Sequence, residues 1–92
     1  MSRDNTVFVG SKPVMNYVAA IMSSLNTSGE AVVKARGRAI SFAVDAVEIT
    51  RKRFLKDIIL DEIEIDTEEV ESFDGKMKNV STIAIVLSRP DY

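Results

Sequence analysis

The chain has 92 residues, of which 46% are hydrophobic and 28% are charged, a composition that fits one globular domain and argues against disorder. It contains no cysteine and no histidine, which excludes a disulfide framework, a thiolate zinc site and a histidine general base. The net charge of −2 conceals a division, because residues 1–56 carry nine Lys and Arg against four Asp and Glu, whereas residues 57–92 carry three against ten. The basic half can bind a polyanion, since the local field outweighs the total charge at close range.

The first half of the chain is predicted to fold as strand, helix, strand and helix. Residues 6–9 form a short strand, and the segment Gly10-Ser11-Lys12-Pro13 follows it, with Ser11 placed to cap the next helix and Pro13 suited to its first turn. Apolar residues at helical spacing predict that helix over residues 14–25, followed by a loop over 26–30 and a strand over 31–35. A long helix is predicted over residues 38–54, and its apolar surface is wider than one sheet face needs. This surface favours a partner subunit, although a well-buried core of a monomer could also use it.

The turn before this second long helix is the most informative segment of the chain. Lys34, Arg36 and Arg38 surround Gly37 there, and no Ser, Thr, Asp or Asn directly precedes the helix to cap it. Free N–H groups, the positive end of a helix and neighbouring guanidiniums together suit a phosphate. A tight turn alone would also use Gly37, and arginines are commonly solvated, so the turn by itself leaves both interpretations open.

The second half is predicted to form two antiparallel strands. A strand over residues 58–67 alternates apolar and acidic side chains, and Asp74-Gly75 predicts a tight turn before a strand over residues 80–87. The apolar side of the first of these strands is expected to hold Ile59, Ile63 and Ile65, and the other side Glu62, Glu64 and Asp66. The complete order is β-α-β-α-β-β.

This order predicts where the cations lie. Strand–helix–strand crossovers are almost always right-handed and make their strands parallel, so the first three strands end at one edge of the sheet. Lys12 from the first turn and Lys34, Arg36 and Arg38 from the second are therefore expected to meet at that edge, where open α/β sheets bind ligands. Four cations and two helix starts favour a nucleic-acid backbone over a single small phosphate ester.

Five segments carry a family resemblance, and together they extend over nearly the whole chain. They are Gly10-Ser11-Lys12-Pro13-Val14-Met15-Asn16-Tyr17-Val18, Lys34-Ala35-Arg36-Gly37-Arg38-Ala39-Ile40-Ser41, Ala43-Val44-Asp45, Arg51-Lys52-Arg53-Phe54 and Val80-Ser81-Thr82-Ile83. These segments resemble the Alba family of archaeal chromatin proteins. The resemblance implies a two-layer α/β (α+β) sandwich similar to the C-terminal domain of translation initiation factor three, a protruding hairpin, a homodimer, and binding to DNA and RNA.

The resemblance also implies roles for individual residues. The basic residue before the first helix and the cations of the second turn contact nucleic acid, Tyr17 lies beside the binding surface, and the hairpin over residues 68–79 is an arm that reaches along the duplex. Phe54 packs between dimers that lie side by side on DNA. The nucleic-acid-binding residues expected on this basis are Ser11, Lys12, Asn16, Tyr17, Lys34, Arg36, Gly37, Arg38, Lys76 and Lys78, and the dimer–dimer contact is expected at Arg53 and Phe54.

Two features depart from the family pattern. Ser11 replaces the first of two adjacent lysines found in many members, which excludes acetylation at that position. The hairpin carries acidic residues on its outgoing limb and basic residues on its return limb: Glu68, Glu69 and Glu71 against Lys76 and Lys78. Because the chain is acidic where bulk DNA-coating members are basic, we expect fewer phosphate contacts, a shallower salt dependence and weaker or more selective binding.

Several of these features have purely structural interpretations as well. The basic residues over 51–56 could bind phosphate, but they also complement the negative end of the second helix, and Glu48 is spaced to pair with Lys52. Phe54 at such spacing is more often a core residue than an interface residue. The acidic segment 57–71 could suggest a metal site, but its alternation with isoleucines is typical of a solvated sheet face, so we expect no metal and no cofactor.

Three functional classes remain. The favoured one is a non-catalytic, dimeric DNA-binding protein of the archaeal chromatin type, which grips double-stranded DNA by its basic turns and hairpin arms in the cytoplasm, on the chromosome. The alternative is an RNA-binding protein, either an RNA chaperone or an accessory subunit of an RNA-processing complex. An enzyme of small phosphorylated substrates is disfavoured, because the chain lacks His, Cys and a Gly-rich loop ending in Lys-Ser/Thr. We also expect a flexible N-terminus over residues 1–5 and no membrane association, since no apolar run is long enough to span a bilayer.

Overall fold

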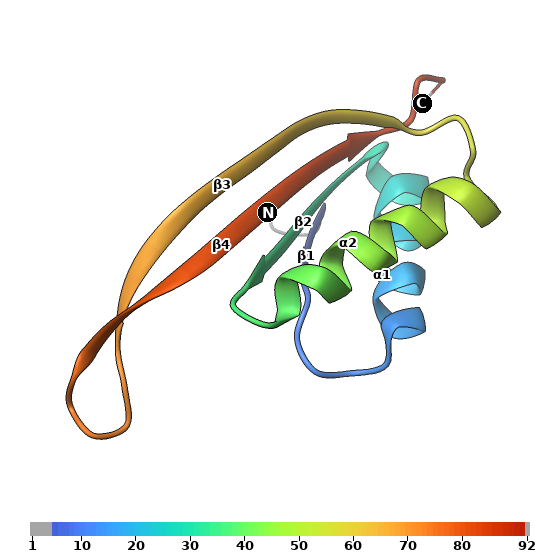
Figure 1. The fold of residues 1–92 in the computed structure, drawn as a ribbon. Helices are drawn as coiled ribbons and strands as arrows, with labels where there is room; N and C mark the ends of the chain where they lie inside the picture. Colours follow the sequence, from blue (N-terminus) through green and yellow to red (C-terminus); the bar gives the residue numbers. More distant parts are fainter. Residues whose placement is uncertain (1–4, 92) are drawn as a thin grey trace.

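The structure, a computed structural model, describes residues 5–91. Its elements follow in the predicted order of strand, helix, strand, helix, strand and strand (Figure 1). They are β1 (Thr6–Phe8), α1 (Val14–Ser28), β2 (Glu30–Arg36), α2 (Ala39–Ile49), the π-helical turn η2 (Thr50–Phe54), β3 (Ile59–Glu71) and β4 (Met77–Ser88). Of the N-terminal segment expected to be flexible, only Asn5 lies within the described residues, and its side-chain amide donates to Glu30 Oε1 at 2.9 Å.

The four strands form one mixed sheet in the order β1-β2-β4-β3. β1 and β2 pair in parallel, whereas β4 pairs antiparallel with both β2 and β3. β1, β2 and β3 therefore run in the same direction and end toward the same side of the sheet, as the crossover argument predicts. The final strand enters the sheet between β2 and β3, so β3 is an edge strand.

Both helices pack on one face of this sheet and leave the other face open (Figure 1). Alternation along β2 reflects this arrangement, because Val33 and Ala35 are buried under the helices while Lys34 and Arg36 are exposed on the open face. The predicted two-layer sandwich is confirmed. The largest fully buried side chains are Val18, Ile21, Leu25, Val33, Thr50 and Leu87.

The first helix is longer than the sequence pattern predicts. α1 continues to Ser28, beyond the predicted end at Leu25, and the Ser28 hydroxyl donates to the Ser24 carbonyl at 2.9 Å. Gly29 then ends the helix in the left-handed conformation (φ 78°), and its N–H donates to the Leu25 carbonyl at 3.0 Å. The predicted loop over residues 26–30 was wrong, because hydroxyl side chains that bond back to the preceding turn are compatible with a helix.

The second helix changes its geometry near its end. It was predicted as one helix over residues 38–54, but α2 runs from Ala39 to Ile49 and η2 continues it to Phe54. Thr50 is fully buried at the junction, and its hydroxyl donates to the Ala46 carbonyl at 2.8 Å. The Leu55 N–H reaches the Thr50 carbonyl at 2.8 Å, five residues back, which is the hydrogen bond of a π-turn.

The β3–β4 hairpin extends far beyond the helices (Figure 1). Both strands exceed their predicted bounds of 58–67 and 80–87, and the antiparallel register continues to the pair Glu71 and Met77. The predicted arm over residues 68–79 is therefore a regular two-stranded ladder that leaves only residues 72–76 for the turn. It gives the molecule a longest dimension of 47 Å against 25 and 21 Å across.

A β-bulge alters the predicted facing of the isoleucines. The register shifts between Leu60 and Glu62, so that Leu60 is opposite the buried Leu87, whereas Ile59 is opposite Ser88. Ile59 therefore does not share a side with Ile63 and Ile65, as the simple alternation had predicted, because a bulge inserts one extra residue into one strand. The expected acidic side is present: Glu62, Glu64 and Asp66 are opposite Val86, Ala84 and Thr82 on the open face.

Candidate nucleic-acid interface

Two basic turns emerge from the same end of the sheet, as Figure 1 shows for the segments after β1 and β2. The Val9 N–H donates to the Lys34 carbonyl at 2.8 Å, so the parallel pairing continues to the start of the first turn. Lys12 lies in that turn, and Arg36 and Arg38 flank Gly37 in the second. We call residues 10–13 and 34–38 together the basic rim.

Tyr17 holds the first of these turns in shape. Its ring is buried, and its hydroxyl accepts hydrogen bonds from the backbone N–H groups of Gly10 at 3.0 Å and Lys12 at 2.9 Å. The Tyr17 side chain, near the start of α1, thereby fixes the backbone on both sides of Ser11. Tyr17, expected to lie beside the binding surface, is placed beneath it, while Ser11, Lys12 and Asn16 are exposed.

Gly37 shapes the second turn. Its φ of 59° lies in the left-handed region, which favours glycine, and its N–H donates to the Ser81 carbonyl of β4 at 2.9 Å. Its carbonyl accepts the Ile40 N–H at 3.2 Å, which starts the next helix. The turn thus reverses the chain while staying bonded to the sheet, and it places Arg36 and Arg38 on either side of the glycine.

Both helices that follow these turns begin without a side-chain cap. The N-cap position of α1 is Pro13 and that of α2 is Arg38, and neither helix has an acidic residue in its first turn. The expectation that Ser11 caps α1 was wrong, because the helix begins at Val14 and its N-cap position is taken by Pro13, whose ψ of 144° is not helical. Each start therefore lacks a side-chain acceptor for its first N–H groups and presents the positive end of its helix dipole, which favours an anion.

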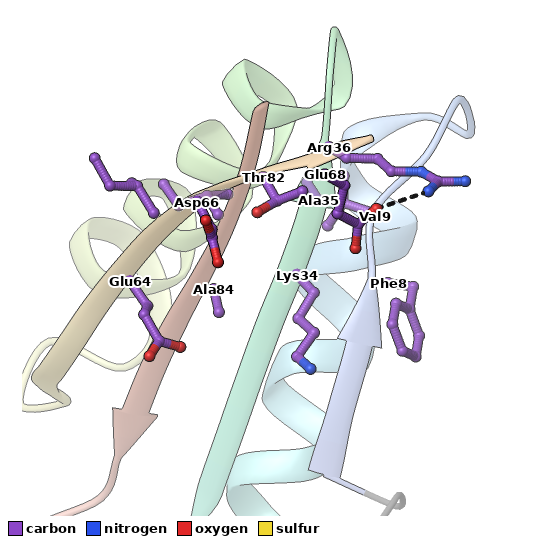
Figure 2. A pocket seen from close by; sticks show the side chains of 12 residues that line it. Phe8, Val9, Lys34, Ala35, Arg36, Glu64, Asp66, Glu68, Thr82 and Ala84 are labelled. Carbon is purple, nitrogen blue, oxygen red and sulfur yellow. Dashed lines mark hydrogen bonds and ion pairs between the residues drawn. The ribbon is translucent and has the colours of Figure 1, made fainter. Parts of the chain in front are cut away.

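The open face of the sheet beside the rim has a basic and an acidic side. One row across the strands is Phe8, Lys34, Ala84 and Glu64, and the next is Arg36, Thr82 and Asp66. Figure 2 shows the shallow hollow that these side chains line, with Lys34 and Arg36 on one side and Glu64 and Asp66 on the other. The hollow forms over β4 because the side chains of this strand on the open face, Thr82 and Ala84, are small.

One ion pair forms between two of the lining residues. Arg36 Nη1 donates to Glu68 Oε1 at 3.1 Å, joining the end of β2 to the base of the arm on β3 (Figure 2). Both side chains stay largely in solvent, 65% and 55% exposed, so the guanidinium remains accessible to a ligand. Charge pairs this exposed contribute about 0–1 kcal/mol to stability.

The other predicted cations make no ion pair with any residue from 5 to 91. Lys12, Lys34 and Arg38 are exposed at the rim, and Lys76 and Lys78 are exposed on the return side of the arm. In register, Lys78 is opposite Val70 and so shares the open face with Arg36, whereas Lys76 belongs to the turn at the tip. The structure thus brings Lys12, Lys34, Arg36 and Arg38 to one end and leaves the two arm lysines apart from them.

A second basic cluster ends the helix at η2. The predicted pair of Glu48 with Lys52 forms at 3.5 Å, and Glu48 also accepts a shorter bond of 2.7 Å from Arg51. That hydrogen bond is the main cause that lowers the pKa of Glu48; burial opposes it, and the positive charges of Arg51 and Lys52 lower the pKa further. Arg53 is exposed and Phe54 is about half exposed, so neither belongs to the core.

Three residues near the interface were missed by the sequence argument. Phe8 is 69% exposed on the open face beside Lys34, and Phe73 is fully exposed at the tip of the arm. Alternation with the buried Val7 and Val9 could have placed Phe8 on the open face. Nothing local could have found the contact of Glu68 with Arg36, because it joins residues far apart in the chain.

Two further findings concern metal ions and membranes. Among residues 5–91, the acidic side chains nowhere gather in a group of three or more suited to a metal ion. Within the same stretch, neither helix is long and apolar enough to cross a bilayer.

Comparison with known proteins yields consistent matches over the full length. The sequence model of the Alba family matches residues 5–67. The chain is 54% identical over 91 residues to the DNA/RNA-binding protein Alba of Methanocella arvoryzae, covering 98% of this chain and 95% of that protein. It is 53% identical over 87 residues to DNA/RNA-binding protein Alba 1 of Archaeoglobus fulgidus, covering 94% and 97% of the two chains.

A solved structure agrees as well. Alba from Thermoplasma volcanium superposes with a TM-score of 0.86 at 48% sequence identity, covering 92% of this chain and all of that one. The likeness therefore includes the arrangement of the helices and strands as well as the sequence.

Proposed function

The chain belongs to the Alba family, and from this premise we propose that it binds nucleic acid as a non-catalytic protein, with the basic rim on the phosphate backbone. The observation that carries the proposal is the emergence of Lys12, Lys34, Arg36 and Arg38 at one end of the sheet, next to two uncapped helix starts. Such groups recognise phosphates and carry little sequence information. Binding is therefore governed by backbone charge more than by base sequence.

Double-stranded DNA is the first polymer we propose, as part of chromosome organisation in the cytoplasm, and the arm would extend along it. RNA is the second candidate, because the relatives at about half identity are named DNA/RNA-binding proteins and the same cations serve either backbone. Lys76 and Lys78 supply the positive charge of the arm, and Ser11 and Asn16 add exposed polar groups beside Lys12. No cofactor enters this proposal.

A homodimer is part of the proposal, supported by apolar surface that one copy leaves uncovered. Ile63 and Ile65 face the same side of the sheet as the buried Ile85, yet they are 54% and 76% exposed because the helices do not reach them. Phe42 of α2 is also about half exposed. A second copy of the chain would bury this surface and bring a second rim and arm to the polymer, and Phe54 would lie between neighbouring dimers.

The proposed binding is tested by titrating matched duplex DNA, duplex RNA and single strands at several salt concentrations. Lys12→Ala is the variant and Lys56→Ala the control, because Lys56 is equally exposed but lies before β3, at the opposite end of the sheet. Loss of one phosphate contact should lower the salt slope on duplex DNA by about 0.9 for each Lys12 engaged. Equal effects of the two changes would contradict a rim interface, and tighter binding of duplex RNA than of DNA would favour the second candidate.

The dimer is tested by sedimentation of Ile65→Asp beside the control Phe73→Asp. Both changes place a carboxylate on an exposed apolar residue of the hairpin, one near the helices and one at the tip. The first should yield monomers and the second should leave the dimer intact. A dimer that survives Ile65→Asp would contradict the proposed contact surface.

A further inference from the structure

The ion pair between Arg36 and Glu68 sets one cation of the rim apart from the others. Among residues 5–91, Arg36 is the one rim cation with a carboxylate partner, since Lys12, Lys34 and Arg38 form no ion pair there. Its partner comes from β3, the acidic strand at the sheet edge, and not from a neighbour in its own turn. A carboxylate held at this guanidinium occupies the place that a phosphate oxygen would take.

The sheet is built so that this contact can form. Arg36 lies opposite Thr82, and Asp66 lies opposite Thr82 from the other side, so two strand spacings of about 4.8 Å separate β2 from β3. The Arg36 side chain extends away from Thr82, and the carboxylate of Glu68, one pleat farther along β3, reaches its guanidinium beside Val9 (Figure 2). Lys34, in the neighbouring row, makes no such contact with Glu64 across Ala84.

We propose that Glu68 is an internal competitor of nucleic acid, a carboxylate that occupies Arg36 in the free protein and must release it before Arg36 can contact a phosphate. This inference rests on the proposed function and adds a residue that sets the strength and salt dependence of binding. The pair is exposed and joined by one hydrogen bond, so a phosphate, which can take two N–H groups of the fork, displaces it readily. Glu68 then stands unpaired beside the polymer.

Competition has a distinctive effect on salt dependence. When Arg36 neutralises a phosphate, a counterion leaves the polymer, but the freed Glu68 carboxylate then stands beside the polymer and attracts cations there, which offsets part of this release. Removing the carboxylate should therefore strengthen binding and also steepen its salt dependence. A carboxylate that only oriented Arg36 toward the polymer would act in the opposite direction, because its removal would weaken binding.

The test compares Glu68→Gln with Glu69→Gln on duplex DNA. Both changes remove one negative charge from the same exposed stretch of β3, but Glu69 lies opposite Asn79 on the other side of the ladder and has no ion pair within the described chain. We expect Glu68→Gln to bind about two- to fivefold more tightly, with a salt slope that is steeper by at most about 0.9 for each Arg36 released. Glu69→Gln should give a much smaller gain in affinity and no change in slope.

A second comparison uses Arg36→Ala, alone and with Glu68→Gln. If Glu68 acts through Arg36, the gain from Glu68→Gln disappears in the Arg36→Ala background. Equal gains from the Gln changes at 68 and 69, a gain that persists without Arg36, or weaker binding by Glu68→Gln would each overturn the competition while leaving nucleic-acid binding intact. A wild-type protein that binds neither DNA nor RNA would overturn the proposed function itself, and the inference with it.

Discussion

The two halves of the β3–β4 hairpin use the same pair of strands under different conditions. Beside the helices, Ile85 and Leu87 are buried and the ladder forms part of the core. In the arm, residues 68–79 are exposed, apart from Val70 and Ser72, which are half buried. The contrast shows that backbone pairing persists well beyond the apolar burial that stabilises the domain. The part of the molecule beside the helices, which we call the body, supplies the stability, whereas the arm adds little besides charge and length.

The turns of the two regions also differ in the hydrogen bonds that hold them. The turn at Gly37 belongs to the body, because its N–H bonds to Ser81 of β4. The turn at Gly75 is held by its own residues: the Ser72 hydroxyl donates to Asp74 Oδ1 at 2.7 Å, and the Gly75 N–H donates to the Ser72 carbonyl at 2.9 Å. A defect at the first turn should reach the whole domain, whereas a defect at the second should stay local.

The largest contrast is expected for stability. Leu87→Ala removes a fully buried side chain from the body and should lower the free energy of unfolding by about 2–5 kcal/mol, because it leaves a cavity. Phe73→Ser at the exposed tip should change it by less than about 0.5 kcal/mol. Urea unfolding at one fixed protein concentration measures both. A loss above 1 kcal/mol for Phe73→Ser would mean that the arm packs against something that stabilises the fold.

The next contrast concerns binding. Arg36→Ala with Arg38→Ala removes two cations of the rim and should weaken binding to duplex DNA by about ten- to a hundredfold, which is about 1.4–2.8 kcal/mol. Lys76→Ala with Lys78→Ala should cost about two- to fivefold, because Glu69 and Glu71 already offset the arm lysines. Fluorescence anisotropy on several unrelated sequences should show the same loss on each. A larger loss from the arm pair would reverse the ranking of the two regions.

Sequence reasoning recovered the features that follow from local patterns. The order of elements, the direction of the first three strands, the tight turn at Asp74-Gly75 and the pair of Glu48 with Lys52 are confirmed, because periodicity, turn chemistry and helical spacing depend on near neighbours. The same kind of local argument predicted only one of the two uncapped helix starts. The start of α2 was foreseen, whereas Ser11 was wrongly assigned as the cap of α1.

What sequence reasoning missed depends on contacts between distant parts of the chain. The bulge between Leu60 and Glu62 arises from register against β4, and it alone changes the side on which Ile59 lies. The buried hydroxyl of Tyr17 beneath the first turn, and the pairing of Arg36 with Glu68, require the positions of segments that no local pattern provides. These two contacts decide how the rim presents its cations.

Glycine substitutions compare the body with the arm through smaller changes in the free energy of unfolding. Gly37→Ala should lower the free energy of unfolding by about 1–2 kcal/mol, because a residue with a Cβ is strained at a φ of 59° although Val80 leaves room for the atom at 3.7 Å. Gly75→Ala, at a φ of 86°, meets the same strain but should mainly open the tip of the arm. Urea unfolding measures the first effect and amide hydrogen exchange at Lys76 the second. Similar losses of global stability for both would show that the arm unfolds together with the body.

The smallest expected effect is a pH dependence of global stability that arises in the body of the molecule and not in the arm. Hydrogen bonding from Arg51 lowers the pKa of Glu48 below 4.5, so the folded state binds this proton less readily than the unfolded chain. The stabilisation is therefore complete above about pH 4.5 and is lost as the pH falls through the lower folded value. Because the pair is more than one-third exposed, it contributes less than about 1 kcal/mol. The free energy of unfolding of Glu48→Gln, measured in urea, should accordingly be lower than that of the wild type at pH 6, and the difference should shrink as the pH falls below 4.5. Hydrogen bonds from Ser72 and Lys76 lower the pKa of Asp74 as well, but Asp74→Asn should alter exchange at the arm tip without this global dependence. A difference between Glu48→Gln and wild type that stays constant down to pH 3 would assign the effect to packing instead of charge.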